Sequence, residues 1–235
     1  MIYDEGKLIF TSLEDKIGIV LNGKDIVKKM QQYGSTNWRQ SEWPGFYLEE
    51  VSRTKLIETI GGSKGRKYGN VEMDYQREFI WDIKTHSTID KNMKNISECI
   101  LNDSEAIEGV QNDFGAAGFI IYFLRPDWDL DGEFKNWHNK EKGEISKYSI
   151  ERVARNAPSR IRKKGGKIVG LKVIMLTKKD IENGKRDGWI KGFQNGMRNS
   201  NGSPRRSKVS VVIDKIPSEC IVSEANEING MDRLE

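Results

Sequence analysis

VEMDYQREFIWDIK, residues 71–84, is the stretch of the sequence that decides the predicted fold. Apolar and charged residues alternate on both sides of a polar centre, Gln76-Arg77-Glu78. A period of two is typical of β-strands that have one apolar face and one charged face. The stretch therefore predicts a hairpin of two strands, at 70–76 and 78–86.

A three-residue turn at 76–78 sets the register that we expect in this hairpin. Glu72 would then lie directly opposite Asp82, with the two β-carbons about 5 Å apart. Asp74 would lie diagonal to Asp82, and Lys84 would follow two residues further along the same face. Because carboxylates on adjacent strands repel each other, this face requires a compensating charge.

A hard divalent cation is the obvious compensator. Mg²⁺ is usually held by one or two carboxylates together with waters and phosphate oxygens. A neighbouring lysine can orient or deprotonate a water and can stabilise the charge that develops on a phosphoryl group. The hairpin thus points to metal-assisted hydrolysis of a phosphodiester. The alternative is an exposed hairpin with ordinary surface charges, because a carboxylate-x-lysine triplet is common by chance.

Outward from the hairpin, apolar patterning predicts the other elements. A helix at 45–60 precedes it, and Pro44 suits the first turn of that helix because its missing N–H costs nothing there. The run GFIIYFL at 118–124 is typical of a central strand covered on both faces. The further expectations are a strand at 8–10, a helix within 17–32, a helix at 89–110, a polar loop at 125–143, a basic helix at 149–163, strands at 167–176 and 209–213, a short helix at 177–184, and a mobile tail from 223. The mixture predicts an α/β (α+β) fold with a central mixed β-sheet flanked by helices.

The acidic residues of the hairpin resemble the signature of the PD-(D/E)xK nucleases. In that superfamily an acidic residue begins one strand and the next strand carries acid-x-lysine, as in Asp82-Ile83-Lys84. The run WDIKTHS at 81–87 resembles type II restriction endonucleases in particular. A helix glutamate in a Gly-x-x-x-Glu pattern often precedes the motif, and Gly45 and Glu49 match it. The match covers 44–87, under a fifth of the chain, and the Pro-Asp of the signature is absent.

The resemblance implies a restriction-endonuclease-like fold in a single nuclease domain over 1–235. The catalytic core would lie at about 44–124 and the elements that recognise DNA at about 125–215. The cofactor would be Mg²⁺, and water would attack the phosphodiester directly and leave 5′-phosphates.

The resemblance also implies a role for each residue of the motif. Asp82 and the first acid would bind Mg²⁺, with Ile83 counted among the metal ligands. Lys84 would assist the attacking water, and Glu49 would support the metal shell. For the first acid, Asp74 is the better chemical match and Glu72 the better register match, so both stay candidates.

The distribution of charge predicts a polyanionic partner. The chain carries a net charge of +4, but 151–208 contains 17 Lys or Arg against 4 Asp or Glu, which leaves −9 for the remainder. Within 188–208, basic and amide side chains alternate with aromatic ones. Arg can read guanine, Asn and Gln can read adenine, and Lys and Arg can hold phosphates. The expected DNA-binding residues are Arg152, Lys163 and Lys164, as a phosphate clamp on the basic helix, and Lys191, Gln194, Asn195, Arg198, Asn199, Asn201, Arg205, Arg206 and Lys208. The alternative is a solvated basic face with a mobile loop.

Composition narrows the remaining classes. With 36% hydrophobic and 31% charged residues, the chain can bury a core under a charged surface. No run approaches the about 18 apolar residues of a membrane span, and 1–10 lacks a signal pattern. Two cysteines, Cys99 and Cys220, make neither a disulfide framework nor a zinc site. We therefore expect a cytoplasmic protein without a membrane partner, and no nucleotide-binding pattern is complete.

The preferred hypothesis is a type II restriction endonuclease that hydrolyses double-stranded DNA with Mg²⁺. A homodimer is expected, because two-fold symmetry suits palindromic sites. A cognate DNA methyltransferase is expected in the same system, although not as a binding partner, since the host's own DNA needs protection. Two alternatives stay open: a repair or recombination nuclease of the same superfamily, and a non-enzymatic DNA-binding protein.

Overall fold

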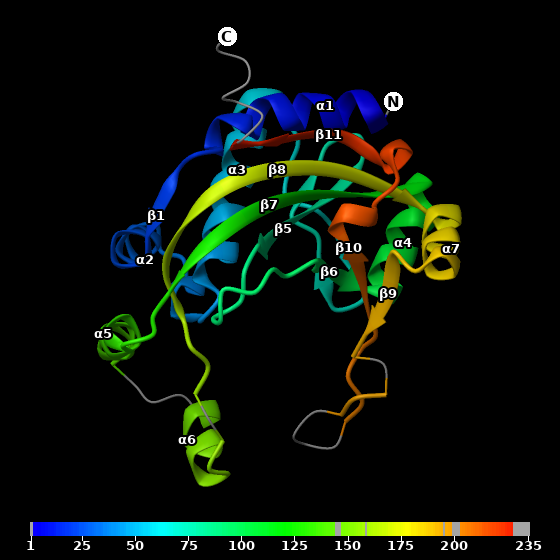
Figure 1. Ribbon diagram of the computed structural model, residues 1–235. Coiled ribbons are helices and arrows are strands. Elements are labelled where there is room, and N and C mark those ends of the chain that lie inside the picture. The colour runs from blue at the N-terminus through cyan, green and yellow to red at the C-terminus, as the bar shows by residue number, and fades with distance from the viewer. Residues whose placement is uncertain (1, 144–146, 158, 195, 199–202, 228–235) are drawn as a thin grey trace.

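A curled central β-sheet organises the molecule. The computed structural model describes residues 2–143, 147–157, 159–194, 196–198 and 203–227. The sheet has the strand order β1-β8-β7-β5-β4, and β11 also pairs with β8. Figure 1 shows its two longest strands, β7 and β8, running together along a pronounced arch. The strands are β1 (Val20–Asn22), β4 (Tyr75–Gln76), β5 (Ile80–Ser87), β7 (Ala116–Trp128), β8 (Lys163–Thr177) and β11 (Ile221–Asn226).

The central sheet is mixed, because β5 and β7 run parallel whereas the other pairings are antiparallel. The connection between the parallel strands passes through β6 (Glu98–Asp103) and the helix α4 (Ser104–Phe114). The predicted mixed α/β architecture, with a central mixed sheet flanked by helices, is confirmed. The predicted central strand is also confirmed, since β7 is buried from Ala116 to Leu124.

Two apolar clusters cover the two faces of this sheet. On one face, Ile9, Leu48 and Tyr122 belong to a cluster that joins the sheet to α1, α2, α3 and α5. On the other, Phe119 and Val211 belong to a cluster that joins it to α4, α7 and a second sheet of order β6-β10-β9. These elements are α1 (Ile2–Leu13), α2 (Gly23–Gln32), α3 (Trp43–Ile60), α5 (Glu133–Lys142), α7 (Lys178–Asp187), β9 (Ile190–Phe193) and β10 (Lys208–Val212).

Several shorter elements complete the described chain. In Figure 1, α5 and α6 at one end of the arch, and the β9–β10 arm at the other end, extend to the same side of it. The short elements are β2 (Lys67–Tyr68), β3 (Val71–Glu72), α6 (Lys147–Ala154) and the 3-10 helices Glu14–Lys16, Asn37–Arg39, Ile213–Lys215 and Ser218–Cys220. None of the helices within the described ranges is long and apolar enough to cross a membrane.

Two predicted helices form where the terminal residues favoured them. Pro44 lies in the first turn of α3, where proline leaves no unmatched donor. Thr177 caps α7, and its hydroxyl and the Asp180 carboxylate exchange hydrogen bonds with each other's backbone N–H groups. This capping box satisfies two donors that would otherwise be exposed at the start of the helix.

Two predictions in the first half of the chain were wrong. The expected strand at 8–10 lies inside α1, because Ile9 and Leu13 are buried at helical spacing. The expected helix at 89–110 is replaced by β6 followed by α4. In β6, Cys99 and Leu101 are buried while Ile100 between them is exposed, so burial alternates as in a strand.

Three predictions further along were also wrong. The expected polar loop at 125–143 contains the end of β7 and the whole of α5. The expected basic helix at 149–163 is reduced to α6, and β8 starts at Lys163. Strand rather than helix forms here because Gly165 lies against β1, where an added β-carbon would be 2.6 Å from the Leu21 carbonyl oxygen. The tail expected to be mobile from 223 begins inside β11, which pairs with β8.

Candidate active site

The hairpin formed by β4 and β5 has a different register from the predicted one. Tyr75 pairs with Trp81 and Gln76 with Ile80, so the turn is 77–79, where the Arg77 N–H donates to the Phe79 carbonyl. The side chains of Tyr75 and Trp81 are both fully buried in the same apolar cluster. Continued by one residue, this register brings Asp74 opposite Asp82 in an antiparallel pair.

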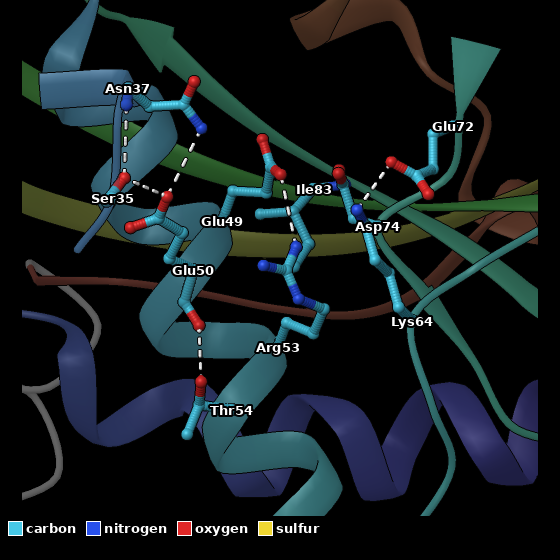
Figure 2. A network of polar contacts seen from close by, with 10 residues as sticks. All are labelled: Ser35, Asn37, Glu49, Glu50, Arg53, Thr54, Lys64, Glu72, Asp74 and Ile83. Carbon is cyan, nitrogen blue, oxygen red and sulfur yellow. Dashed lines mark hydrogen bonds and ion pairs between the residues drawn. The ribbon is translucent and has the colours of Figure 1, made fainter. Parts of the chain in front are cut away.

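Glu72 was predicted to lie opposite Asp82, and that prediction was wrong. Glu72 belongs to β3, which pairs with β2, so that its partner across the strands is Lys67. Its side chain is 53% exposed and lies 2.5 Å from Lys64 Nζ. The hydrogen bond from Lys64 lowers the pKa of Glu72. Figure 2 shows Glu72 joined to Lys64, while Asp74 lies between it and the helix that carries Glu49.

Asp82 lies at the centre of a buried polar cluster. Its carboxylate side chain is 3% exposed, and Lys84 Nζ is 2.6 Å from its Oδ2. Asn102 of β6 donates its side-chain amide to the same oxygen over 2.9 Å. Asn102 was not predicted, because it lies twenty residues further along a segment that was expected to be helical. These two side chains fix one orientation of the Asp82 carboxylate.

Asp74 completes a pair of buried carboxylates. Its Oδ2 accepts the backbone N–H of Ile83 over 2.6 Å, and the residue is 6% exposed. Burial first, and the neighbouring charge of Asp82 second, raise the pKa of Asp74 well above its usual range, while Lys84 opposes the shift. Ile83, predicted among the metal ligands, packs its side chain in the apolar cluster and meets Asp74 through its main chain.

Lys84 carries the compensating charge within the cluster. Burial by itself lowers the pKa of its ammonium group, but the charges of Asp82, Asp74 and Glu49 together raise it. Its side chain is still 22% exposed. Lys84 is therefore held as a cation that contacts a carboxylate and also reaches the surface.

Glu49 lies beside this cluster on α3. Its charge contributes to the pKa shifts of both Asp74 and Lys84. Its carboxylate pairs with Arg53 one turn along the helix, at 3.2 Å. Gly45 brings the start of α3 close to β5, since a β-carbon on it would lie 4.0 Å from Thr85 Cβ. Figure 2 shows Glu49 extending from α3 toward Ile83 and Asp74.

A buried glutamate from the N-terminal helix holds the turn of this hairpin. Glu5 of α1 is 2% exposed. Its carboxylate accepts the backbone N–H groups of Glu78 and Phe79, at 3.0 and 3.3 Å, and the indole N–H of Trp81 at 2.7 Å. Three donors satisfy a buried carboxylate that would otherwise be costly. The turn that sets the register of Asp74 and Asp82 is thus fixed by a helix more than seventy residues earlier in the chain.

The donor set of the cluster fits a hard cation. Within the described part of the chain, no three His, Cys, Asp or Glu side chains are already gathered as a metal site. Mg²⁺, however, needs only one or two protein carboxylates, with waters and phosphate oxygens completing its shell. Asp74 and Asp82 offer two carboxylates, with Glu49 near them, and the cluster contains no sulfur or imidazole ligand. The residues present therefore suit Mg²⁺ and do not suit zinc.

The predicted phosphate clamp is not formed as expected. Lys163 and Lys164 lie in β8 rather than on a helix with Arg152. Lys163 is 8% exposed, pairs with Glu42, and lies over the ring of Trp128. Arg152 of α6 donates to the Ala157 carbonyl over 2.8 Å. Arg152 thus lies on a different element from the two lysines, and Lys163 is already neutralised.

The β9–β10 arm carries the other predicted DNA-binding residues. Lys191 pairs with Glu98, and Arg198 forms a β-bridge with Pro204. Asn195, Asn199 and Asn201 lie outside the described residues. The remaining four predicted residues line a cavity of about 220 Å³ together with one acidic residue. The lining consists of Gln194, Pro204, Arg205, Arg206, Lys208 and Asp103.

Asp103 neutralises part of this cavity. Arg206 Nη1 lies 2.5 Å from its Oδ2, and Lys208 Nζ lies 3.5 Å from its Oδ1. Asp103 directly follows Asn102, which contacts Asp82. The base of the β9–β10 arm and the carboxylate cluster therefore meet at two adjacent residues of β6.

Comparisons with family models, with curated proteins and with solved structures gave no match for this chain. The functional argument consequently depends on the geometry of the cluster and on the chemistry of its side chains.

Proposed function

We propose that this chain is a Mg²⁺-dependent endonuclease that hydrolyses phosphodiesters of double-stranded DNA, of the type II restriction kind within the PD-(D/E)xK superfamily. One observation carries the proposal. The register of β4 and β5 brings two buried carboxylates, Asp74 and Asp82, into one pair, and Lys84 lies 2.6 Å from the second of them. With Glu49 on the preceding helix, the cluster matches the residue types that such chemistry needs.

Burial of the pair argues against ordinary surface charges. Asp74 and Asp82 are 6% and 2% exposed, respectively, although an isolated buried carboxylate is strongly disfavoured. Lys84 neutralises the charge of Asp82, and loss of the Asp74 proton leaves one negative charge that a cation can balance. Buried charges that repel each other are retained when they serve a site, and perturbed pKa values such as that of Asp74 are common there.

Each residue has a distinct task in the proposed reaction. Asp74 and Asp82 hold the cation, Glu49 supports its shell, and the main chain of Ile83 orients Asp74. When bound, Mg²⁺ supplies Lewis acidity and favours the hydroxide form of a bound water. Lys84 donates a hydrogen bond to the attacking water and offsets the negative charge that develops on the phosphoryl oxygens. Water adds to phosphorus, the bond to the 3′ oxygen breaks, and 5′-phosphate and 3′-hydroxyl ends result.

The proposed substrate and assembly follow from charge and symmetry. The excess of cations at 151–208 supports a polyanionic substrate. The β9–β10 arm, which presents Gln194, Arg205 and Arg206 beside the cluster, is the proposed reader of base edges. A homodimer would present two such sites to a palindromic sequence. We place the protein in the cytoplasm, together with a methyltransferase that protects host DNA.

Digestion of phage DNA tests the proposal. The wild-type chain with Mg²⁺ should give discrete bands, and chelation with EDTA should stop the reaction. Asp82→Ala should be inactive, whereas Glu72→Ala, which removes an equal charge from the exposed Lys64 pair, should cleave normally. A smear or random nicks would favour the repair or recombination nuclease. Cleavage by Asp82→Ala would contradict both nuclease readings, and salt-dependent binding without cleavage would favour a DNA-binding protein.

A further inference from the structure

A second and larger cavity lies at the end of the arch away from the β9–β10 arm. Its volume is about 720 Å³. It is lined by β1, the start of α2, the connection between β5 and β6, the ends of β7 and β8, and the start of α5. We call this cavity the distal cleft. Its charged lining residues are Lys24, Lys91, Arg125, Lys164 and Lys167 against Asp127, Asp131 and Glu133, which is an excess of two positive charges.

Three cations of the distal cleft have no ion-pair partner among the described residues, whereas Lys167 pairs with Glu227. Lys24, Lys91 and Arg125 are exposed, and none of them forms an ion pair with another residue in the parts of the chain that the structure covers. Lys164 lies 3.8 Å from Asp127, at the outer limit of a pair. On the acidic side, Asp131 accepts the backbone N–H of Glu133 at the start of α5. Three unneutralised cations from three separate elements therefore surround one concavity.

One wall of the distal cleft continues the sheet face that carries the carboxylate cluster. Residues paired directly across adjacent strands point to the same side, and Asp82 pairs with Phe119 and Lys84 with Ile121. His86 and Phe123, the next pair on this face, have ring centroids 5.8 Å apart. Side chains alternate along a strand, so Arg125, two residues beyond Phe123, points to this face as well. The Arg125 side chain is thus the exposed continuation of the row that begins at Asp82.

The distance along this row suits a second phosphate contact on one duplex. From the pair of Asp82 with Phe119 to Arg125 is six residues, which is about 20 Å at 3.3 Å per residue. Stacked base pairs rise about 3.4 Å each, so about six of them cover the same distance. A duplex with one phosphodiester at Asp82 can therefore have its backbone at the distal cleft.

We infer that the distal cleft binds the sugar-phosphate backbone of the DNA duplex, about six base pairs from the bond that is cut. This inference rests on the proposed function and extends it to Lys24, Lys91 and Arg125, which the sequence did not single out. Lys and Arg side chains on separate elements hold backbone phosphates without reading bases. The cleft contributes affinity and register, while sequence is read at the opposite end of the arch.

Binding measured as a function of salt concentration tests the inference. The Asp82→Ala chain binds a 30-base-pair duplex without cutting it, so that dissociation constants can be measured between about 50 and about 200 mM NaCl. Into this chain we would introduce the double change Lys91→Ala and Arg125→Ala. The matched control is Lys7→Ala with Lys28→Ala, which removes the same charge from exposed positions outside the cleft. Lys7 lies on α1, and Lys28 lies one turn beyond Lys24 on α2.

The cleft variant should bind the duplex more weakly at low salt and depend less on salt. Two lost phosphate contacts lower the slope of log K against log salt by about 1.8. Over a fourfold rise in salt, the parent chain should therefore lose about tenfold more affinity than the cleft variant. The control pair should keep the slope of the parent.

The outcomes separate the two proposals. Suppose that the wild-type chain cleaves DNA but that the cleft variant and the control variant have the same slope of log K against log salt. The inference about the distal cleft is then overturned, and the proposed function stands. If the wild-type chain neither binds nor cleaves DNA, the proposed function fails and the cleft inference fails with it. With Asp82 restored, the cleft variant should still cleave plasmid DNA at low salt and high protein concentration, since it leaves the carboxylates unchanged.

Discussion

The β4–β5 hairpin and the β9–β10 arm both carry charged side chains, but the hairpin buries them and the arm exposes them. The hairpin buries Asp74 and Asp82 almost completely, holding Asp82 with Lys84 and Asn102 and Asp74 with the Ile83 N–H. The arm exposes Arg205 and holds the exposed Arg206 with a single carboxylate. Buried charges are costly and must be oriented in advance, whereas exposed charges adapt to a partner at little cost. The difference separates the proposed catalytic cluster from the proposed DNA-contact surface.

Removal of a buried acid should have the largest effect. Asp74→Ala should lower the rate of DNA cleavage by about 1,000-fold or more, because one of the two proposed cation ligands and the partner of the Ile83 N–H are lost. Glu72→Ala, which alters only an exposed pair with Lys64, should change the rate by less than about twofold. Steady-state cleavage of a supercoiled plasmid measures both. Equal losses in the two variants would contradict the observed register as the basis of the site.

Replacement of the buried cation should have the next largest effect. Lys84→Gln should lower the cleavage rate by about 100-fold, the usual range for loss of a group that assists proton transfer or stabilises charge. Binding of the duplex should change little, since Lys84 is only 22% exposed. Single-turnover cleavage and equilibrium binding on the same duplex separate the two quantities. A loss of DNA binding without a loss of the single-turnover rate would show that Lys84 contacts DNA and takes no part in the chemistry.

The raised pKa of Asp74 predicts how stability depends on pH. In the absence of metal, with EDTA present, the pKa of Asp74 is higher in the folded chain than in the unfolded chain. Between these two pKa values the folded chain binds a proton that the unfolded chain has lost. The free energy of unfolding therefore falls as the pH rises through this range. Asp74→Asn should remove that dependence and stabilise the metal-free chain at pH 8 by about 1 to 3 kcal/mol. Urea unfolding at pH 5 and pH 8 measures the difference. Identical pH slopes for both chains would show that the carboxylate is not held protonated.

Loss of the supporting amide should have a smaller effect. Asn102→Leu removes the donor to Asp82 at similar volume and should lower activity or metal affinity by about tenfold, as is usual for residues that orient a ligand. The Mg²⁺ concentration for half-maximal cleavage should rise with it. A control is Asn92→Leu, at an exposed turn that makes no contact with Asp82. An unchanged Mg²⁺ requirement would exclude Asn102 as a positioning residue.

A single exposed cation should have the smallest effect. Arg205 lines the small cavity of the β9–β10 arm. Arg205→Ala should lower the slope of log K against log salt for DNA binding by about 0.9. Over a fourfold rise in salt concentration, the wild-type chain should therefore lose about threefold more affinity for DNA than the variant. If the variant loses far more affinity for one cognate sequence than for random DNA, Arg205 reads a base. An equal loss of affinity for both identifies a phosphate contact.

The parts of the fold that were predictable are those encoded locally. The helix that starts at Pro44, the capped helix after Thr177 and the buried run at 118–124 each carry a local signal. The pair Asp82 and Lys84 was placed on one strand for the same reason, since alternation along a strand needs only neighbouring residues.

What could not be predicted depends on distant contacts. Whether Glu72 or Asp74 faces Asp82 is decided by the pairing of Tyr75 with Trp81 in the core and by the pairing of β3 with β2. Asn102 reaches Asp82 only because β6 packs beside β5, a neighbour that no local pattern reveals. Lys163 was expected on a helix, but the close approach of Gly165 to Leu21 turns that segment into a strand.

The contact of Glu5 with the turn at 77–79 couples two distant steps of folding. The Glu5 carboxylate lacks these donors until Glu78, Phe79 and Trp81 have been synthesised. The docking of α1 and the closure of the hairpin are therefore coupled steps rather than successive ones. Amide hydrogens of α1 and of the hairpin should consequently exchange with solvent at a common rate. A local opening of this helix would loosen the geometry of the carboxylate cluster about seventy residues away in the chain.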